Sequence, residues 1–211
     1  MEHPTLEHEM RLWQAGYAAI AGLDEAGRGA LAGPVVAGAV ILPKNIRQEG
    51  IWAEVRDSKM LTPVQRDEMA GRIRSAAAGW AVGEASAQEI DEIGIAPATR
   101  LAMQRAIHTL TASPDYLLLD WVRLTIVNLP QESYTKGDQR IVSISAASIL
   151  AKVHRDSLLV EMDRIYPRYG FARHKGYGAA SHLAAIAAHG PCPQHRQSFA
   201  PLRPARTLFE K

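Results

Sequence analysis

The sequence predicts a single α/β domain in which a mixed sheet is flanked by helices. Two short apolar runs come first, at residues 17–23 and 35–42, and segments of helical and strand character alternate after them. Hydrophobic residues make up 47% of the 211 residues and charged residues 22%, which is typical of a soluble globular chain. Because no repeat, low-complexity tract or Ser/Gly-rich linker divides the chain, we expect one domain rather than two.

The elements follow from local patterns. The runs at 17–23 and 35–42 are separated by glycines and Pro34, which favours two strands joined by a compact loop. Thr62-Pro63 predicts the start of a helix over about 63–78, because threonine caps helices and proline is tolerated at the first helical position. Further along, the pattern predicts a strand at 80–86, a helix at 96–110, a strand at 116–119 and an extended piece at 124–129.

The longest predicted helix covers residues 141–165, where isoleucines, valine and leucine trace one broad face until Tyr166-Pro167 ends it. A last helix is predicted over 181–188. Four prolines between residues 191 and 204 predict an extended C-terminal arm packed on the surface. We therefore divide the chain into an N-terminal segment at 1–16, one domain at 17–202 and a short tail at 203–211.

The net charge of +2 hides an asymmetry along the chain. Residues 1–163 hold 16 Lys and Arg against 21 Asp and Glu, whereas residues 164–209 hold seven Lys and Arg and no acid. A basic segment after an acidic one predicts an anionic partner, and nucleic acid is the most common large one. A solvated basic surface without a partner would account for the same excess.

Membrane insertion and secretion are not expected. The longest apolar run, at 31–42, is broken by glycine and proline and is too short to span a bilayer. Residues 1–12 contain acids and no apolar core, so they do not form a signal peptide. The only cysteine, Cys192, excludes an internal disulfide and fits a reducing compartment, so we expect a cytoplasmic protein.

Two adjacent acids, Asp24 and Glu25, follow the first apolar run and precede a glycine-rich turn. Ionised carboxylates beside a low-dielectric interior need positive charge nearby, and a divalent cation supplies it. Side chains alternate along a strand, so the two acids would point to opposite faces unless the strand ends there. For this pair taken alone, a polar strand end that faces water is the favoured interpretation.

Asp120 and Asp138 add two further acids. Asp120 directly follows three leucines at the carboxyl end of a predicted strand, where open α/β sheets place their sites. Asp138 lies just ahead of the long helix, and a helix N-cap would explain it by itself. No local rule explains all four acids together. Carboxylate oxygens suit Mg²⁺ or Mn²⁺, whereas zinc would require histidine or cysteine at short spacing.

The segment Asp24-Glu25-Ala26-Gly27-Arg28-Gly29, followed by residues 31–35, resembles the opening signature of bacterial ribonuclease HII. The resemblance covers residues 17–202 in unbroken order. It continues through Asp57-Ser58-Lys59, Asp120, Lys136-Gly137-Asp138, residues 146–153 with Arg155-Asp156, residues 174–177 and residues 195–199.

The resemblance implies a ribonuclease H-like fold that cuts RNA in RNA–DNA hybrids and incises 5′ of single ribonucleotides in duplex DNA. It implies that Asp24, Glu25, Asp120 and Asp138 are catalytic and hold two divalent ions, Mg²⁺ or Mn²⁺. One ion would lower the pKa of the attacking water and the other would stabilise the leaving 3′ oxygen. The products would carry 5′-phosphate and 3′-hydroxyl ends.

The resemblance also implies a substrate-binding set. The Gly27-Arg28-Gly29 turn would lie in the minor groove, where its backbone can reach the ribose 2′-hydroxyl, and Tyr177 would stack on the following sugar. Lys59, Lys136 and Arg196 are candidates for phosphate contacts, although each could be an ordinary surface charge. The expected partners are RNA–DNA hybrids and ribonucleotide-containing duplex DNA, bound by a monomer.

The chain departs from the family pattern in two places. Trp121-Val122-Arg123 follows Asp120 where many relatives have a glycine-containing turn, and a longer helical C-terminal extension is not expected. A resolvase-like or transposase-like nuclease could share the acids but would lack the Gly-Arg-Gly turn. A non-catalytic nucleic-acid binder would leave the acids unexplained. Ser148 and Lys152 lie one helical turn apart, as packing residues do, so we do not predict that they form a nucleophile pair.

Overall fold

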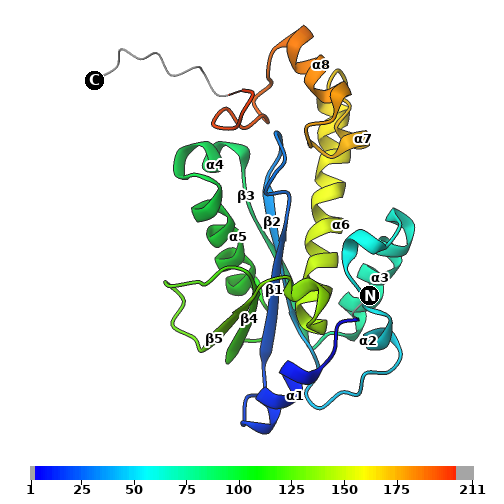
Figure 1. Cartoon of the computed structure of the whole chain (residues 1–211), viewed down its shortest axis with the longest axis vertical. Helices are drawn as coiled ribbons and strands as arrows, with labels where there is room; N and C mark the ends of the chain where they lie inside the picture. Colours follow the sequence, from blue (N-terminus) through cyan, green and yellow to red (C-terminus); the bar gives the residue numbers. More distant parts are fainter. Residues whose placement is uncertain (1–2, 203–211) are drawn as a thin grey trace.

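The computed structural model describes residues 3–202 and has a five-stranded mixed sheet at its centre (Figure 1). The strand order is β3-β2-β1-β4-β5, with β1, β2 and β3 antiparallel and with β4 and β5 parallel to β1. This confirms the predicted mixed sheet. The strands are β1 (Ile20–Ala26), β2 (Val35–Ile41), β3 (Gly79–Ala85), β4 (Tyr116–Asp120) and β5 (Gln131–Tyr134).

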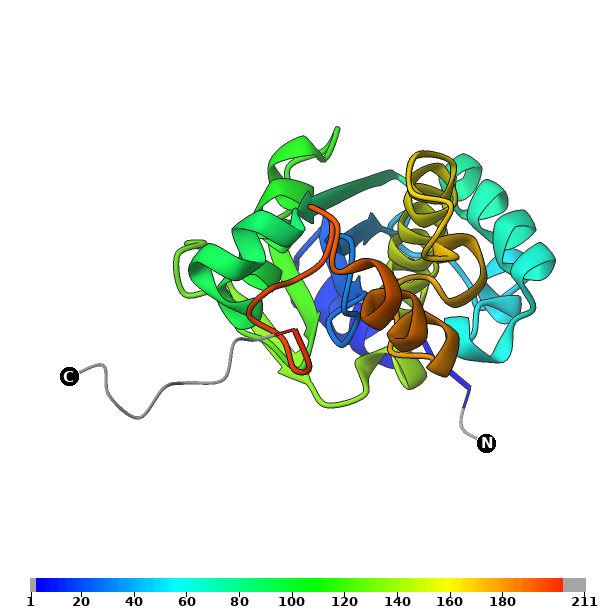
Figure 2. The ribbon, with the colours of Figure 1, turned by 90° about the horizontal axis from the view of Figure 1, so that it is seen from above.

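Helices cover both faces of this sheet (Figure 2). One face carries α6 (Val142–Ile165) with α1 (Glu7–Gln14), α2 (Ile51–Glu54) and α3 (Pro63–Ala76). The other face carries α5 (Ile95–Thr109) with α4 (Ala87–Ile93). Short elements complete the fold: the 3₁₀ turns η1 (Ser58–Met60) and η2 (Gly137–Gln139), and the helices α7 (Phe171–His174) and α8 (Ala180–His189).

Two glycines let α6 lie directly against the sheet. A Cβ atom on Gly22 of β1 would fall 2.3 Å from the carbonyl carbon of Ser143, and one on Gly38 of β2 would fall 2.2 Å from the carbonyl oxygen of Ala147. Any side chain at these positions would push the helix away. This close packing brings the first half of α6 beside the carboxyl-terminal half of β1.

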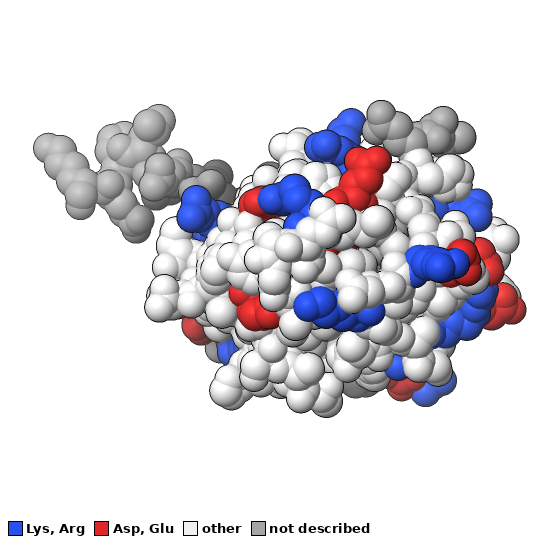
Figure 3. Space-filling view, turned by 90° about the horizontal axis from the view of Figure 1, so that it is seen from below, with Lys and Arg blue, Asp and Glu red and all other residues white. Residues whose placement is uncertain are grey.

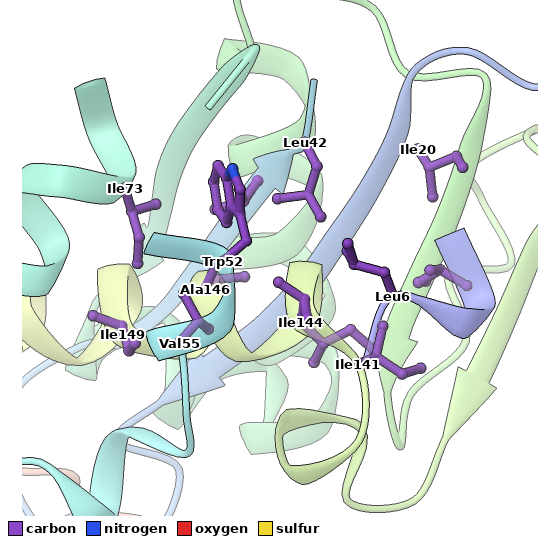
Figure 4. Close-up of a cluster of buried hydrophobic side chains, with 14 of the residues drawn as sticks. Leu6, Ile20, Leu42, Trp52, Val55, Ile73, Ile141, Ile144, Ala146 and Ile149 are labelled. Atoms are coloured by element: carbon purple, nitrogen blue, oxygen red, sulfur yellow. The ribbon is translucent and has the colours of Figure 1, made fainter. Parts of the chain in front are cut away.

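The core between the sheet and α6 also contains the beginning of the chain (Figure 4). Leu6, Leu12 and Trp13 are buried in the same cluster as Ile144 and Ile149, and burying a side chain of this size contributes about 1.5–3 kcal/mol. The buried Glu9 carboxylate accepts a 2.9 Å hydrogen bond from the Ser143 backbone at the start of α6. The N-terminal segment therefore packs against the domain through Leu6, Leu12 and Trp13, and α1 was missed because it is short and rich in charge.

Most sequence-predicted elements are confirmed. The helix predicted at 63–78 begins at Pro63, and Thr62 and Gln65 form a capping box in which each side chain bonds the other residue's backbone. The predicted strands at 80–86 and 116–119 and the predicted helices at 96–110, 141–165 and 181–188 correspond to β3, β4, α5, α6 and α8 within about two residues.

Two expectations are wrong. Residues 124–129 form turns rather than an extended piece, because the Gln131 side chain bonds both the N–H and the carbonyl of Leu124 and so replaces a strand partner. Residues 191–202 also form turns, and His195 and Arg196 are buried rather than lying on the surface. The predicted tail at 203–211 lies outside the described residues. Within residues 3–202, no helix is long and apolar enough to cross a membrane.

Candidate active site

Asp24 and Asp120 lie at the same level on neighbouring parallel strands. The register of β1 and β4 pairs Leu23 with Leu119, so the two aspartates are the next residues along each strand. Glu25 follows Asp24 within β1, which continues to Ala26 rather than ending at the acids as expected. All of these carboxylates line one cavity of about 400 Å³.

Asp138 reaches the same cavity from η2, directly ahead of α6. Lys136 takes a left-handed backbone conformation there, with φ 58°, and the chain then turns so that the Gly137 N–H donates a 2.8 Å hydrogen bond to Asp120. A Cβ atom on Gly137 would fall 2.7 Å from Ile144 of α6. The turn is therefore packed tightly between β4 and α6, and it holds two of the acids near one another.

Each of the four carboxylates binds a donor from the protein itself. Asp24 accepts from the Glu25 backbone at 2.7 Å. Glu25 accepts from the Trp121 indole N–H, at 2.9 and 3.0 Å for its two oxygens. Asp138 accepts from the Lys59 ammonium at 3.0 Å. These donors orient the acids, but the positive charge they bring is smaller than the negative charge they face.

The pKa values reflect this shortage of positive charge. Burial raises the pKa of Asp24 well above its ordinary value, and the nearby charges of Glu25 and Asp120 raise it further. Burial raises the pKa of Glu25 to about 7, although the Trp121 N–H and the Arg28 charge oppose that rise. Burial likewise raises the pKa of Asp120. A carboxylate cavity that favours protonation in this way is one that a divalent cation would stabilise in its ionised form.

The donor set fits a hard divalent ion. Four carboxylates and no histidine or cysteine line the cavity, and oxygen ligands of this kind suit Mg²⁺ or Mn²⁺. Within residues 3–202, no three His, Cys, Asp or Glu side chains are already arranged as an ion cage. Each acid is engaged with its own protein donor, and ion binding would exchange some of these bonds for metal ligation.

The glycine turn, residues 27–29, lines the same cavity together with Tyr177, whose residue is 38% exposed. We call this second set of lining residues the glycine wall and the four carboxylates the acid wall. Gly27 has φ 92°, and a Cβ atom there would fall 1.9 Å from Nε of Arg155, so the fold itself requires glycine. Gly29 differs. It has no positive φ, and nothing lies within 4 Å of its Cβ position. Packing inside the molecule therefore does not explain Gly29, whose backbone is open to the cavity.

Two buried arginines hold this wall in place. Arg155 donates to the carbonyls of Ala32, Pro34 and Lys175 at 2.9–3.0 Å, and it thereby joins the glycine turn to the loop that carries Tyr177. Arg196 donates twice to the carbonyl of Gly33, at 2.9 and 3.0 Å, and once to that of Arg28, at 2.8 Å. The partners are backbone carbonyls rather than carboxylates. Burial accordingly lowers the pKa of both guanidiniums, to about 9 for Arg196.

The prediction that Arg196 contacts phosphate is wrong, because its side chain is fully buried and all three of its donor nitrogens are engaged inside the protein. Lys59 lines the cavity and its side chain is 74% exposed, whereas Lys136 is exposed but does not line the cavity. The structure thus brings nine of the eleven predicted site residues together: Asp24, Glu25, Gly27, Arg28, Gly29, Lys59, Asp120, Asp138 and Tyr177.

Sequence reasoning also missed residues of the cavity. Ser148 and Lys152 line it from α6, so their interpretation as packing residues was incomplete. The Ser148 hydroxyl lies 3.1 Å from that of Ser58, another residue of the cavity, and the Lys152 ammonium donates to Asp156 at 2.8 Å. Their spacing of one helical turn was the available signal, because it places both side chains on one face of the helix. Nothing in the local pattern indicated the roles of Arg155 and Trp121.

A mixed sheet in this order, with acids where its two central parallel strands end, defines a nuclease of ribonuclease H-like fold. The family model for ribonuclease HII matches residues 21–202, and the chain belongs to the ribonuclease HII family. It is 54% identical over 200 residues to a ribonuclease HII of Roseiflexus castenholzii, covering 94% of this chain and 89% of the relative. It is 50% identical over 201 residues to one of Dehalococcoides mccartyi, covering 95% and 94%.

A solved structure gives the same result at the level of the fold. The ribonuclease H2 of Pyrococcus horikoshii OT3 matches with a TM-score of 0.72 and 26% identity, over 87% of this chain and 95% of that one. This protein is accordingly a ribonuclease H, an endonuclease that depends on divalent metal ions and acts on RNA–DNA hybrids.

Proposed function

We propose that this ribonuclease H incises duplex DNA on the 5′ side of a single embedded ribonucleotide, in addition to hydrolysing RNA in hybrids. The single observation that carries the proposal is the layout of one cavity. Its one wall holds four carboxylates, and its other wall holds an open glycine turn and a half-exposed tyrosine. A cavity of this kind can act on a phosphodiester at one wall while a single sugar is recognised at the other.

The acid wall would hold two divalent ions, Mg²⁺ or Mn²⁺, through Asp24, Glu25, Asp120 and Asp138. Ions bound there would supply a water of lowered pKa and stabilise a leaving 3′ oxygen, and the products would then carry 5′-phosphate and 3′-hydroxyl ends. The protein's own residues keep these carboxylates in place. The Glu25 N–H orients Asp24, the Gly137 N–H orients Asp120, and Lys59 orients Asp138.

The glycine wall would read the ribose. A 2′-hydroxyl is the one group that separates RNA from DNA at a given sugar, and a backbone group can bond it only where no side chain intervenes. Gly29 meets that requirement, because it has no side chain and nothing lies within 4 Å of its Cβ position. The fold itself does not need a glycine there, which leaves contact with a substrate as the reason for it. Tyr177 offers an aromatic face for the next sugar, at the same wall.

Phosphate contacts belong near the cavity in this proposal. Lys59 and Lys136 are exposed and are the remaining candidates from the predicted set. Figure 3 shows the end of the molecule near α1, where basic and acidic side chains are interspersed among uncharged ones. This face therefore carries no patch of a single charge. One chain supplies every residue of the cavity, so a monomer suffices, and the buried free thiol of Cys192 is compatible with work in the cytoplasm.

One cleavage assay tests the proposal. The substrate is a DNA duplex with a single ribonucleotide, incubated with Mg²⁺, Mn²⁺ or EDTA, and the products are mapped on a sequencing gel. We expect one incision 5′ of the ribonucleotide with either ion and none with EDTA. An all-DNA duplex and a continuous RNA–DNA hybrid serve as controls. Cleavage confined to the continuous hybrid, or equal cleavage of the all-DNA duplex, contradicts the proposal.

A further inference from the structure

The Trp121 side chain touches both walls of the cavity. Its indole N–H donates to the two oxygens of Glu25 at 2.9 and 3.0 Å, on the acid wall. On the glycine wall, the guanidinium carbon of Arg28 lies 3.8 Å from the centre of the Trp121 ring, which is a close cation–π contact. The same Arg28 lies 3.9 Å from Glu25, so the three side chains form one connected group.

The backbone at Trp121 indicates that an aromatic residue here has a role beyond packing. Its φ is 43°, in the left-handed region that bulky residues rarely adopt. The strand ends at Asp120, and the Trp121 N–H then bonds the carbonyl of Tyr134 at 2.9 Å, which holds this conformation. Glycine would adopt the same backbone without strain, and the indole is only partly buried. Strain of this kind collects at functional sites.

The contact with Glu25 matters because that carboxylate is nearly enclosed. The Glu25 side chain is 8% exposed. The indole N–H bonds both of its oxygens and so fixes the direction in which they point. Groups that orient a metal-binding carboxylate in this way commonly change metal affinity by about 10- to 100-fold when they are removed.

We propose that Trp121 is a positioning residue that holds Glu25 for a divalent ion and, through the same ring, holds Arg28 against the glycine turn. Metal binding on one wall and ribose binding on the other are then linked by a single indole. This inference rests on the proposed function, because it requires Glu25 to be a metal ligand. It also concerns a position at which this chain departs from the family pattern.

The first test measures Mn²⁺ binding directly, from the electron paramagnetic resonance signal of free Mn²⁺. Trp121→Phe keeps an aromatic ring under Arg28 but removes the N–H donor. Trp121→Gly removes both contacts and suits the left-handed backbone, so it guards against a variant that fails to fold. We expect both variants to bind Mn²⁺ about 10- to 100-fold more weakly than the unsubstituted protein. The matched control is Trp80→Phe, which changes another tryptophan that lies over an arginine, Arg74, on the far strand β3.

The outcomes separate this inference from the proposed function. If Glu25→Gln binds Mn²⁺ as tightly as the unsubstituted protein, the proposed metal site itself is wrong. If Glu25→Gln weakens binding but Trp121→Phe stays within about twofold of the unsubstituted protein, the metal site stands and the role of Trp121 is overturned. A loss of binding in Trp80→Phe equal to that in Trp121→Phe overturns it as well.

Two further readouts test the link between the walls. Mn²⁺ quenches nearby fluorophores, so adding it should lower the tryptophan emission of the unsubstituted protein and leave that of Trp121→Phe unchanged. Equal quenching in both proteins contradicts the contact with the ion site.

For the single-ribonucleotide duplex, the KM of Trp121→Gly should exceed that of Trp121→Phe, because only the glycine variant loses the ring under Arg28. Equal KM values at saturating Mn²⁺ overturn the part of the proposal that concerns Arg28.

Discussion

The two walls of the active-site cavity are built in different ways. The acid wall stands on regular elements, with Asp24 in β1, Asp120 at the end of β4 and Asp138 just ahead of α6. The glycine wall lies on two loops, at residues 27–34 and 175–177. Buried arginines donate hydrogen bonds to the backbone carbonyls of these loops. The acids can therefore be changed without moving the backbone, whereas the loop at residues 27–34 depends on side chains more than 100 residues away in sequence.

The energetic consequence of this difference is large. Arg155 and Arg196 together make six hydrogen bonds to five backbone carbonyls, and both guanidiniums are buried. A buried charge that loses its partners is strongly destabilising, commonly by about 3–5 kcal/mol. On the acid wall, by contrast, burial and the neighbouring carboxylates raise the pKa values of Asp24 and Glu25 and so disfavour their ionised forms. Substitutions should thus lower activity at the acid wall and lower both stability and recognition at the glycine wall.

The largest effect on activity is expected for Asp120→Asn. The amide removes ligand charge but keeps an oxygen that can accept from the Gly137 N–H, so the turn should survive. We expect kcat to fall by more than about 100-fold, which is about 2.7 kcal/mol of transition-state stabilisation, with an unchanged melting temperature. Steady-state kinetics and thermal denaturation measure both quantities. A variant that keeps more than about a tenth of the original kcat would rule out the ligand role.

The next largest effect is expected for Arg155→Lys. Lysine lacks the planar fork that reaches the carbonyls of Ala32, Pro34 and Lys175 together, and each buried carbonyl left without a donor costs about 1–3 kcal/mol. The free energy of unfolding should fall by several kcal/mol. The KM for the single-ribonucleotide duplex should rise, and Mn²⁺ affinity should stay unchanged because the acid wall is intact.

The control for Arg155→Lys is Ile73→Ala, which removes a buried side chain of α3 and costs about 2–5 kcal/mol of stability without touching the glycine wall. If Ile73→Ala raises the KM as much as Arg155→Lys does, the effect follows from lost stability alone. Urea denaturation and steady-state kinetics of both variants distinguish the two cases.

The contribution of the glycine wall to stability should also depend on pH. Behind Tyr177, the His182 Nδ1–H donates to the Tyr177 carbonyl at 2.9 Å, and the Nε2 atoms of His182 and His195 lie 3.1 Å apart. The Cys192 N–H donates to Nδ1 of His195 at 3.0 Å, so both ring nitrogens of His195 are engaged while the ring is neutral. Burial lowers the pKa of His195 to about 4 from an ordinary value of 6.5.

The sign of the pH effect follows from these values. Below pH 6.5 the unfolded chain takes up a proton at His195 that the folded protein does not take up until about pH 4. The contribution of His195 to stability is therefore fully present above pH 6.5 and declines as the pH falls toward 4, by at most about 3 kcal/mol. Urea denaturation at pH 7 and pH 4.5 should show a smaller loss of stability in His195→Gln than in the unsubstituted protein. An equal loss in both proteins would contradict the assignment.

The comparison of the walls also explains what could be predicted from the sequence. The acids stood out from local patterns, such as Asp120 directly after three leucines, but their roles as metal ligands were implied by the family resemblance. The helix at Pro63 was predictable because its capping residues are adjacent in sequence. The glycine turn and Tyr177 were identified from the family resemblance, and the structure places them at one cavity.

The errors arise where tertiary contacts decide. Arg196 was predicted to contact phosphate because a basic segment is usually exposed, but its partners are carbonyls near residue 30, at the other end of the chain. Composition carries no signal for such a contact. Trp121 was noted only as a departure from the family pattern, since its contact with Glu25 spans 96 residues. Residues 124–129 were predicted to be extended from their apolar character, yet the Gln131 side chain satisfies the Leu124 backbone instead.

A smaller effect than that of the acids is expected for Tyr177→Ala. The aromatic face that it removes is worth about 1–3 kcal/mol when it stacks on a nucleotide. Cleavage at a single ribonucleotide should fall by about 10- to 100-fold, while the Mn²⁺ dependence stays the same because the acids are untouched. Tyr177→Phe should retain most of the activity, since it keeps the ring. A change in the metal dependence of Tyr177→Ala would show instead that the walls are not separable at this residue.

The smallest effect, and the sharpest test of the glycine wall, is expected for Gly29→Ala. Nothing lies within 4 Å of the Cβ position of Gly29, and its φ is not positive, so the added methyl group should leave the melting temperature unchanged. Gly27→Ala is the contrasting variant, because its methyl group would collide with Arg155 at 1.9 Å on a backbone with φ 92°. It should lose stability and activity together. Gly29→Ala should lose affinity alone, with a KM about tenfold higher for the single-ribonucleotide duplex, about 1.4 kcal/mol.

This pair of variants distinguishes a glycine required for stability, Gly27, from a glycine required for substrate affinity, Gly29. If Gly29→Ala cleaves with an unchanged KM, the backbone of residue 29 does not contact the ribose. Arg28 and Tyr177 must then recognise the 2′-hydroxyl. If Gly27→Ala is as stable as the unsubstituted protein, Arg155 can move away from the turn at little cost in free energy. The six hydrogen bonds of the buried arginines would then stabilise the glycine wall less than their number implies.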